Sequence, residues 1–428
     1  MDNLIAAVVQ DVEAGMEVNV KNHTHVLIFN TRICAENVTN IFYPTRKTAF
    51  ADFSCGSSNI NVLGMEVNVN TAFFIIIMLV MMLIMFISLY YLSIKINKLL
   101  TRFNINISKR LTTLGVLIVC IIAFVTHSAF LGFIAYSIML FIVFDILKGI
   151  LKLFEKDNKV SNVCRKIYGD GMLVVILALV ITIYGAYNAR HLYVKEYKVT
   201  IDKEMKEDLN IIMISDIHAG TSVNEHQLDI MKEEINKLKP DIVCLTGDIF
   251  DERSSDKIIG YVCDTLGKLE TKYGVYYISG NHDVDMYDKF EDGFKKNNIH
   301  ILDEEVILIN DSFYLAGRRD RMAENRKTIN DLLEGVDESY PVILLDHRPD
   351  DIDAIKKSNV DLQLSGHTHN GQIFPLNFVV GLFNDVSYGH KKYNNYNVIV
   401  SSGYGTWGFP VRTGSSAEIV KVLLQGRK

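Results

Sequence analysis

The 428-residue sequence lacks an excess of positive charge, and its long apolar segments lack almost all charge. Lysine and arginine together number 44, against 50 aspartates and glutamates. Thr71–Thr200 holds 14 of the basic and 5 of the acidic residues, so the remainder has 30 basic against 45 acidic residues. Such an acidic remainder repels a polyanion, which disfavours nucleic acid as substrate or partner. The scarcity of ionisable residues in the apolar segments also disfavours a transport path, because such paths usually need them.

Hydrophobic residues are abundant instead, at 49% of the chain, which is high for a soluble protein of this length. The uncharged run Ala72–Leu92 has about the roughly 20 residues that a membrane-spanning helix needs. Leu111–Phe144 suits a helical hairpin with its turn at Thr126–Ser128, and Gly171–Tyr187 is a further apolar run. The sequence therefore predicts an all-α transmembrane region of about four helices at residues 71–190.

Basic residues between these runs predict an orientation, because Lys and Arg in short loops tend to remain cytoplasmic. The loops after the first and third predicted spans are both basic: Lys95, Lys98, Lys109, Arg102 and Arg110, then Lys148, Lys152, Lys156, Lys159, Arg165 and Lys166. If both loops are cytoplasmic, everything after Tyr187 lies outside the cytoplasm. We therefore expect a multi-pass protein of the cell membrane with an extracytoplasmic C-terminal domain.

The first 70 residues contain both copies of a short repeat, the second of which leads into the first apolar run. GMEVNV occurs at Gly15–Val20 and again at Gly64–Val69. The repeat is either a small duplication or the sign of an upstream region in front of a start at Met65. Residues 1–70 support no domain assignment and are treated as an N-terminal extension of open status.

From about Asp208 onward, segments typical of strands and helices alternate. Strands are predicted at 209–215, 241–247, 274–279, 341–345 and 360–365, and helices at 224–239, 255–270 and 351–358. This alternation predicts an α/β layered domain at 200–428. In such folds ligands bind beyond the carboxyl ends of the strands, so those ends are where a site is expected.

Polar residues follow all five predicted strands. A histidine after one strand is more often a turn residue than a metal ligand, but five such strand ends in order reverse those odds. Seven candidate donors exceed the roughly four that a single zinc uses, whereas two ions bridged by one carboxylate can share them. Residues two apart in an extended segment point the same way, so a pair of histidines at that spacing can serve both ions. The strand-end residues are Asp216-Ile217-His218, Asp248, Asn281-His282-Asp283, His347 and His367-Thr368-His369.

The ordered motifs DIH, GD, GNHD, H and GHTH resemble the calcineurin-like metallophosphoesterase family, whose pattern is D-x-H, G-D, G-N-H-D/E, H and G-H-x-H. The resemblance covers roughly Leu209–Leu424. The segments LSGHTHNGQIFP, LLDHRPD and GYGTWGFPVRTGSSAEIVKVLL further resemble the YkuE-like branch, several members of which have an N-terminal multi-span region. Members more often have Gly where this chain has Asn370. The resemblance implies a four-layer α/β/β/α sandwich.

The resemblance also implies two divalent metal ions and their ligands. One ion would be held by Asp216, His218 and His369, and the other by Asn281, His347 and His367. Asp248 would bridge the two ions, because each of its oxygens can bind one of them. The mixed Asp, Asn and His donors fit manganese, iron or zinc, and the resemblance favours manganese.

The catalytic roles implied by the resemblance fall on His282 and Asp283. His282 would stabilise charge or protonate the leaving oxygen, and Asp283 would orient that imidazole through a hydrogen bond. A metal-bound hydroxide would attack phosphorus. The expected function is therefore that of a membrane-anchored metallophosphoesterase that hydrolyses a phosphomonoester, phosphodiester or pyrophosphate of a small molecule or a lipid.

Two alternatives stay open beside this interpretation. A non-catalytic membrane sensor or scaffold that retained the fold would be expected to lack ligands, and none is missing here. Tyr404, Trp407 and Phe409 are either core residues, as such aromatics more often are, or contacts for an acyl chain or headgroup. Four arginines could contact a phosphate, although surface arginines are commoner than substrate arginines: Arg318, Arg319, Arg348 and Arg412. The oligomeric state is not indicated by any of these residues.

Overall fold

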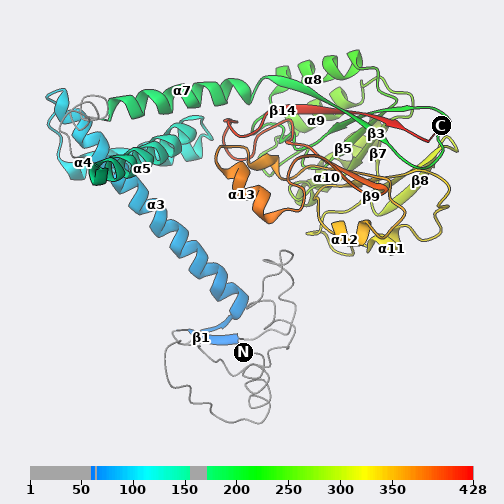
Figure 1. Ribbon diagram of the computed structural model, residues 1–428, viewed down its shortest axis with the longest axis horizontal. Helices are drawn as coiled ribbons and strands as arrows, with labels where there is room; N and C mark the ends of the chain where they lie inside the picture. The colour runs from blue at the N-terminus through cyan, green and yellow to red at the C-terminus, as the bar shows by residue number, and fades with distance from the viewer. Residues whose placement is uncertain (1–58, 63–64, 155–170, 428) are drawn as a thin grey trace, which may run out of the picture. The chain divides into compact units, whose positions relative to one another are not determined.

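The structure, a computed structural model, describes residues 59–62, 65–154 and 171–427 and divides into two compact units, Met1–Ser88 and Leu89–Lys428 (Figure 1). In the first unit, β1 (Asn59–Val62) pairs antiparallel with β2 (Met65–Asn68), and the long helix α3 (Val69–Arg102) begins. The second copy of the GMEVNV repeat thus forms β2 and the start of α3. The first copy lies outside the described residues.

Apolar helices follow at the predicted places: α4 (Lys109–Val125), α5 (Phe130–Phe154) and α7 (Met172–Asn188). The predicted turn at Thr126–Ser128 separates α4 from α5, and the Ser128 hydroxyl accepts a hydrogen bond from the Phe130 N–H. Stretches of α3 and α5 are long and apolar enough to cross a membrane, whereas α7 is a shorter apolar helix. Within the part of the chain that the structure describes, two helices therefore meet the length that spanning requires.

The remainder of the second unit is built on two six-stranded mixed sheets. The first has the order β3 (Leu192–Thr200), β14 (Ala417–Gln425), β4 (Leu209–Ile214), β5 (Ile242–Thr246), β6 (Val275–Ile278) and β7 (Ile299–Ile301). The second has the order β12 (Gly389–Tyr393), β13 (Tyr396–Val400), β11 (Leu362–Ser365), β10 (Val342–Asp346), β9 (Phe313–Arg318) and β8 (Glu305–Ile309). The first sheet begins at Leu192, before the predicted domain start at 200, because β3 pairs with β14 from the C-terminal end of the chain.

Alternate residues of the central strands face different layers, as the pleat of a strand requires. In β4, Ile211 and Met213 pack in the cluster that joins the two sheets, whereas Ile212 and Ile214 pack in the cluster that contains helix residues. The helices of that second cluster are α8 (Glu225–Lys237), α9 (Asp256–Leu266) and α10 (Tyr287–Lys296). Strands β5 and β6 of this sheet are buried at every residue and β4 at every residue but Asn210, so they are core strands; β10 and β11 of the second sheet are likewise fully buried.

The second sheet carries its own cluster on the face away from the first, formed with α11 (Ile329–Leu332) and α12 (Ile352–Ile355). The predicted helix at 351–358 is thus a single turn. Two 3₁₀ turns, η1 (Val284–Met286) and η2 (His369–Gly371), and the helix α13 (Leu376–Phe383) complete the domain. Strands β4, β5 and β6 run parallel, as do β9, β10, β11 and β13, so their carboxyl ends gather at common edges.

Candidate metal centre

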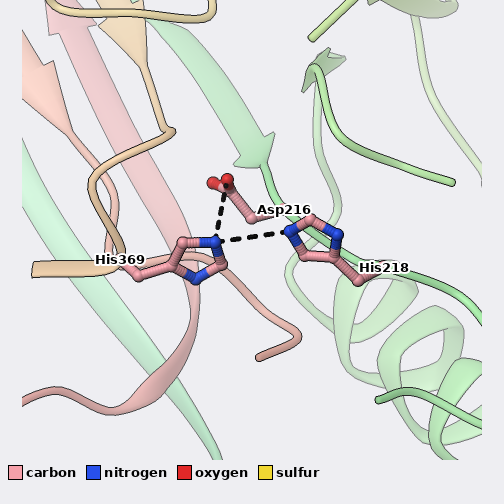
Figure 2. A group of neighbouring side chains, drawn as sticks. All are labelled: Asp216, His218 and His369. Carbon is pink, nitrogen blue, oxygen red and sulfur yellow. Dashed lines mark hydrogen bonds and ion pairs between the residues drawn. The ribbon is translucent and has the colours of Figure 1, made fainter. Parts of the chain in front are cut away.

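The first group of candidate ligands joins the ends of β4 and β11. Asp216 and His218 follow β4, and His369 follows β11; one ligand atom of each lies within 4.8 Å of the others. Figure 2 shows the two imidazoles turned toward each other with the carboxylate beside them. The Nε2 atoms of His218 and His369 are 3.3 Å apart, and His369 Nε2 is 3.4 Å from Asp216 Oδ1. Three donors thus converge on one small volume.

The second group joins the ends of β5, β10 and β11. Asp248, His347 and His367 again have ligand atoms within 4.8 Å of one another. His347 Nε2 is 3.2 Å from Asp248 Oδ2, and His218 Nε2 of the first group is 4.0 Å from the same oxygen. Asp248 therefore lies within reach of both groups, where a bridging carboxylate would stand.

Asn281 supplies a further donor at the end of β6. Its Oδ1 is buried and has no hydrogen-bond partner within the described chain. A buried polar atom without a partner costs about 1–3 kcal/mol, so such an atom calls for an explanation. A bound cation would satisfy this oxygen, and the residues present fit a metal ion.

Burial and mutual charge set the protonation of the ligands. Burial lowers the pKa of His218 to about 4 and that of His367 to about 3, and it lowers the pKa of His369 well below its usual value. These three imidazoles are neutral at pH 7, the form that binds metals. Burial raises the pKa of Asp216 to about 7.

His347 and Asp248 behave as a pair. Burial alone would lower the pKa of His347, but the charge of Asp248 outweighs it and raises that pKa to about 10. Burial would likewise raise the pKa of Asp248, but His347 holds it well below its usual value. When no metal ion is bound, the positive charge of protonated His347 balances the negative charge of Asp248. The His347 Nδ1 atom lies 2.8 Å from the Thr246 carbonyl oxygen, and this contact fixes the ring.

The backbone at these strand ends is unusual, because five predicted ligands have positive φ: Asp216, His218, Asp248, His367 and His369. Residues other than glycine adopt this region rarely and at a cost of about 1–3 kcal/mol, and such residues cluster at functional sites. Asn370, at φ 48 and ψ 40, is in the same region, which asparagine tolerates better than most residues. The departure from the usual glycine at this position is therefore compatible with the backbone.

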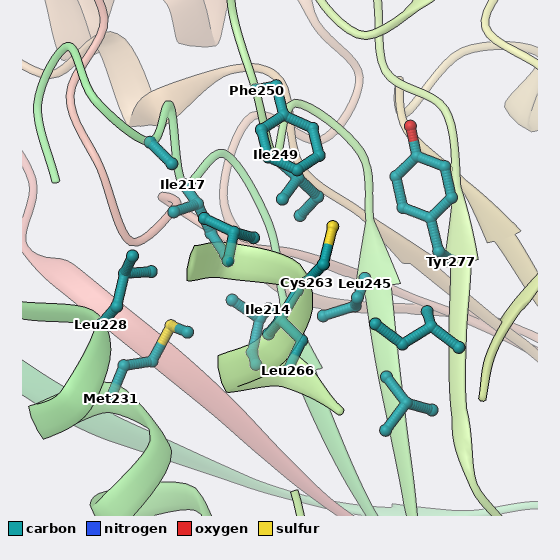
Figure 3. Close-up of a cluster of buried hydrophobic side chains, with 14 of the residues drawn as sticks. Ile214, Ile217, Leu228, Met231, Leu245, Ile249, Phe250, Cys263, Leu266 and Tyr277 are labelled. Carbon is teal, nitrogen blue, oxygen red and sulfur yellow. The ribbon is translucent and has the colours of Figure 1, made fainter. Parts of the chain in front are cut away.

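Hydrophobic residues between the ligands anchor these strained turns. Figure 3 shows Ile217, which separates Asp216 from His218, in one cluster with Ile249 and Phe250, which follow Asp248. All three are fully buried. Because the apolar side chains are held by the core of α8, α9 and α10, the polar neighbours are directed to the opposite side, toward the site.

The predicted pairing of Asp283 with His282 is replaced by a different arrangement. The buried Asp283 carboxylate accepts hydrogen bonds from the N–H groups of Ile249, Phe250 and Gly280, at 3.3, 2.9 and 3.0 Å. His282 Nδ1 instead lies 3.1 Å from Glu252 Oε1. Asp283 therefore ties the GD loop to the GNHD loop, and Glu252 is the carboxylate that orients His282. Glu252 stands only four residues after Asp248, so its place near the GD motif is the sequence signal for this contact.

The four arginines named as possible phosphate contacts differ in their partners. Arg318 is buried against Asp346 and Asp351, and Arg319 pairs with Asp303. Arg412 is fully buried: it donates to the Gly403 and Gly405 carbonyls and its Nη2 lies 3.4 Å from His369 Nδ1. The guanidinium groups of these three arginines bind other groups of the protein.

Arg348 is the one of these four arginines that is both beside a candidate ligand and partly exposed. Its Nε donates to Asp320 at 2.7 Å, and its Nη1 lies 3.1 Å from His367 Nε2. Asp320 is fully buried, so it fixes the guanidinium against the second ligand group. The aromatics also divide: Tyr404 is a core residue whose hydroxyl donates to the Gln227 carbonyl, whereas Trp407 is exposed.

Comparisons with known proteins agree with this geometry. The model of the calcineurin-like phosphoesterase family matches residues 209–371. An uncharacterized metallophosphoesterase of Campylobacter jejuni is 31% identical over 300 residues, which are 67% of this chain and 78% of that protein. The chain belongs to the calcineurin-like phosphoesterase family.

Other relatives of this calcineurin-like phosphoesterase have similar names. An uncharacterized metallophosphoesterase of Helicobacter pylori is 35% identical over 54% of this chain, and the match spans 63% of that protein. A transmembrane protein with metallophosphoesterase domain from Danio rerio is 29% identical over 68% of this chain and 71% of that protein. The family consists of phosphoester hydrolases that work with two metal ions, and this chain has the candidate ligand groups for both.

Proposed function

We propose that the chain is a membrane-anchored, dinuclear metal-dependent phosphohydrolase that cleaves a phosphomonoester, a phosphodiester or a pyrophosphate. The observation that carries this proposal is the placement of two ligand groups on either side of Asp248, with the buried Asn281 Oδ1 left unpaired between strand ends. The non-catalytic alternative has no comparable support, because it predicts that ligands are missing.

The proposed assignment gives each ion its own set. Asp216, His218 and His369 would hold one ion, and His347 and His367 would hold the other, as their two close groups suggest. We add Asn281 to the second set because its Oδ1 is buried and unpaired, and Asp248 to both sets because it lies within 4.0 Å of His218 and 3.2 Å of His347. When bound, the ions supply Lewis acidity that lowers the pKa of a water molecule and neutralises charge on the phosphoryl oxygens. Oxygen and nitrogen donors without thiolate suit manganese, iron or zinc, and we propose manganese first.

The chain's own residues then bind and orient the substrate. Arg348, fixed by Asp320, offers guanidinium N–H groups beside His367 to a phosphoryl oxygen. His282 is part-exposed at the rim of the centre, where its imidazole can deliver a proton to the leaving oxygen. Glu252 holds that ring from the solvent side through Nδ1, which leaves Nε2 for the substrate.

Two observations support the proposed membrane anchor: the long apolar helices, and the similarity to a zebrafish protein named as a transmembrane protein. About four helices at residues 71–190 would form it, ahead of a four-layer α/β/β/α phosphoesterase domain of the YkuE-like branch at 200–428, with residues 1–70 as an extension. Lys95, Lys98 and Arg102 lie toward the end of α3, and α4 begins at Lys109. The α4–α5 turn and the C-terminal end of α7 instead contact the catalytic domain. This arrangement supports an extracytoplasmic domain, because the basic ends then face the cytoplasm.

The test is hydrolysis of p-nitrophenyl phosphate and bis-p-nitrophenyl phosphate by the full chain in detergent, first stripped of metal and then supplied with manganese, iron or zinc. We expect turnover that depends on metal and falls by at least about 10³-fold in Asp248→Asn, since the shared carboxylate affects both ions. Asp264→Asn, an exposed carboxylate on α9, is the matched control and retains the activity. A folded protein that turns over neither ester with any of the metals would favour the sensor function.

A further inference from the structure

Helix α13 exposes an apolar surface beside the metal centre. None of its eight residues is buried, although six of them are large and apolar, and five of these six are exposed. Leu382 is 81% exposed and Phe378 is 64% exposed. With two flanking aromatics they form what we call the α13 surface: Phe374, Leu376, Phe378, Val379, Leu382, Phe383 and Trp407. Each such side chain costs about 1.5–3 kcal/mol when it is left in water instead of being buried, so a covering environment is expected.

The α13 surface is connected at one end to the metal centre. The ligand His369 is in η2, and Gln372 directly follows that turn. The buried Gln372 side chain donates to the Trp407 and Phe409 carbonyls, and its Oε1 accepts the Trp407 N–H at 2.7 Å. The loop that carries Trp407 and the loop that leads to α13 are therefore held together within a few residues of a metal ligand.

The same two loops also connect the α13 surface to the apolar helices. The Tyr136 hydroxyl of α5 donates to the Phe374 carbonyl at 3.0 Å and also contacts Thr413. His127, in the α4–α5 turn, has its Nδ1 2.8 Å from the Gly408 carbonyl oxygen, next to Trp407. The exposed apolar residues of the helices, such as Phe124 at the end of α4, thus continue into the α13 surface.

Side chains typical of a membrane boundary also lie at the C-terminal end of α7. The C-terminal part of α7 carries two exposed tyrosines, Tyr184 and Tyr187, and is followed by the exposed Arg190. Asn188 at its end donates to the Arg412 and Ser415 carbonyls, in the loop that also carries Trp407. Tyrosine and tryptophan with a nearby arginine are typical of the boundary between a membrane and water.

We propose that the α13 surface lies in the interfacial layer of the bilayer that holds the apolar helices, and that the centre acts on a phosphoester carried by an acyl-chain lipid. The inference rests on the proposed membrane-embedded phosphohydrolase and adds the substrate class. An interfacial helix lies with its apolar face roughly 5–10 Å into the headgroup and acyl boundary. A lipid in that layer presents its phosphate at the depth of the centre while its chains stay among their neighbours.

The chain has one tryptophan, so its fluorescence reports on the α13 surface alone. The full chain is reconstituted into phosphatidylcholine vesicles with and without a phosphatidylcholine brominated on its acyl chains near the headgroup. We expect brominated lipid to quench Trp407 about twofold or more, and aqueous iodide to quench it little, because the indole is at the interface. Quenching by iodide and not by brominated lipid would overturn the interfacial placement, and cross-linking of two copies through α13 would then assign the surface to self-association.

Moving the tryptophan tests α13 itself. Trp407→Phe combined with Phe378→Trp or with Leu382→Trp places the single indole on the helix, and both are expected to be quenched by brominated lipid. Trp407→Phe with Leu308→Trp, an exposed apolar position on β8, is the matched control and is expected to respond to iodide only. An α13 indole that behaves like the Leu308→Trp control would contradict the proposal.

The substrate class is tested separately. The triple variant Phe378→Ser, Leu382→Ser, Phe383→Ser is expected to keep its turnover of p-nitrophenyl phosphate and to lose about tenfold or more on phosphatidic acid or phosphatidylglycerol in vesicles, since the interfacial anchor is weakened. Ile230→Ser with Leu308→Ser is the control for exposed apolar substitutions. Turnover of the nitrophenyl esters without turnover of either lipid would overturn the lipid substrate and leave the phosphohydrolase standing; no turnover of anything would count against the phosphohydrolase, while the quenching result still decides the surface.

Discussion

At the scale of the residue, the protonation of the ligands is decided by how they are buried together. His218 and His369 face each other as neutral rings, because desolvation outweighs the attraction of Asp248. His347 is charged without metal, because Asp248 lies 3.2 Å from it. The centre is therefore a set of neutral donors around one ion pair, and metal binding must displace the proton of that pair.

Metal uptake by the stripped protein is predicted to release about one to two protons at pH 7. His347, with a pKa of about 10, loses one proton, and Asp216, with a pKa of about 7, is half protonated. Both pKa values lie above or near the working pH, so the apparent affinity rises with pH: about 100-fold per unit below pH 6 and about tenfold per unit near pH 8. Titration calorimetry in two buffers of different ionisation enthalpy counts the protons. An affinity that is flat from pH 6 to 8 would contradict this account.

Substitution of Asp283 is predicted to lower stability, whereas substitution of Glu252 is predicted to lower the rate of turnover. Asp283→Asn lowers stability by about 1–3 kcal/mol, because the new amide turns N–H groups toward backbone donors that the carboxylate accepted. Glu252→Gln keeps the stability and lowers kcat about three- to tenfold, because only the hold on His282 is weakened. Thermal unfolding and steady-state rates measured on both variants separate the effects. Equal losses of stability would mean that Glu252 is structural as well.

At the scale of the element, the site exists because strand ends approach one another more closely than side chains permit. A Cβ atom on Gly366 would overlap Ser215 Oγ and Asp216 Oδ2, and one on Gly280 would overlap Asp248 Oδ1. The glycines of the GHTH and GNHD motifs are thus required by packing between sheets and loops. The same close approach holds the ligands in the positive-φ conformations that bring them together.

Gly366→Ala is therefore predicted to separate the ends of β4 and β11. We expect at least about tenfold weaker metal binding and about 2–4 kcal/mol lower stability, since neither overlapping atom is free to move without displacing a ligand. Gly260→Ala in α9 is the matched control: nothing lies within 4 Å of its added Cβ, and alanine is the better helix former. Metal titration and denaturant unfolding of the two variants test this; unchanged metal affinity in Gly366→Ala would show that the strand ends can adjust.

At the scale of the second unit, the apolar helices and the catalytic domain share hydrogen bonds. Arg412 N–H donates to the Gly185 carbonyl of α7 while the Arg412 side chain lies against His369. A helix end and a metal ligand are therefore two contacts of one residue. The proposed membrane anchor is therefore continuous with the scaffold of the centre, which fits the proposed enzyme at a membrane surface.

The proposed extracytoplasmic orientation of the catalytic domain predicts which positions can be labelled from outside. In a variant without the native cysteines, Glu305→Cys on β8 is expected to react with a membrane-impermeant maleimide in right-side-out vesicles. Asn106→Cys, in the exposed loop between α3 and α4, is expected to react only after permeabilisation. The reverse pattern would place the catalytic domain in the cytoplasm and leave the chemistry of the centre unaffected.

Much of the centre was predictable because its signals are local. The period of the apolar residues predicts β4, β5, β6, β10 and β11, and a polar motif follows each one in the chain itself. Parallel strands bring their carboxyl ends to a common edge whatever the rest of the domain does, so the motifs alone predict candidate ligands, and six of the seven fall into the two close groups. The turn between α4 and α5 was equally local, because a polar triplet interrupts an apolar run.

The tertiary structure was needed to show which charged and apolar groups from distant segments become partners. Glu252 takes the place beside His282 that was expected of Asp283, Arg412 is a buried support and Arg348 reaches the centre, because burial and competing donors choose among carboxylates that look alike in sequence. β3 joins β14 across the length of the domain. The chemistry at the strand ends follows from the sequence alone, since it depends on residues a few positions apart. The pairing of the charges and the exposure of α13 among the described elements follow from the folded chain, since both depend on which remote surfaces meet.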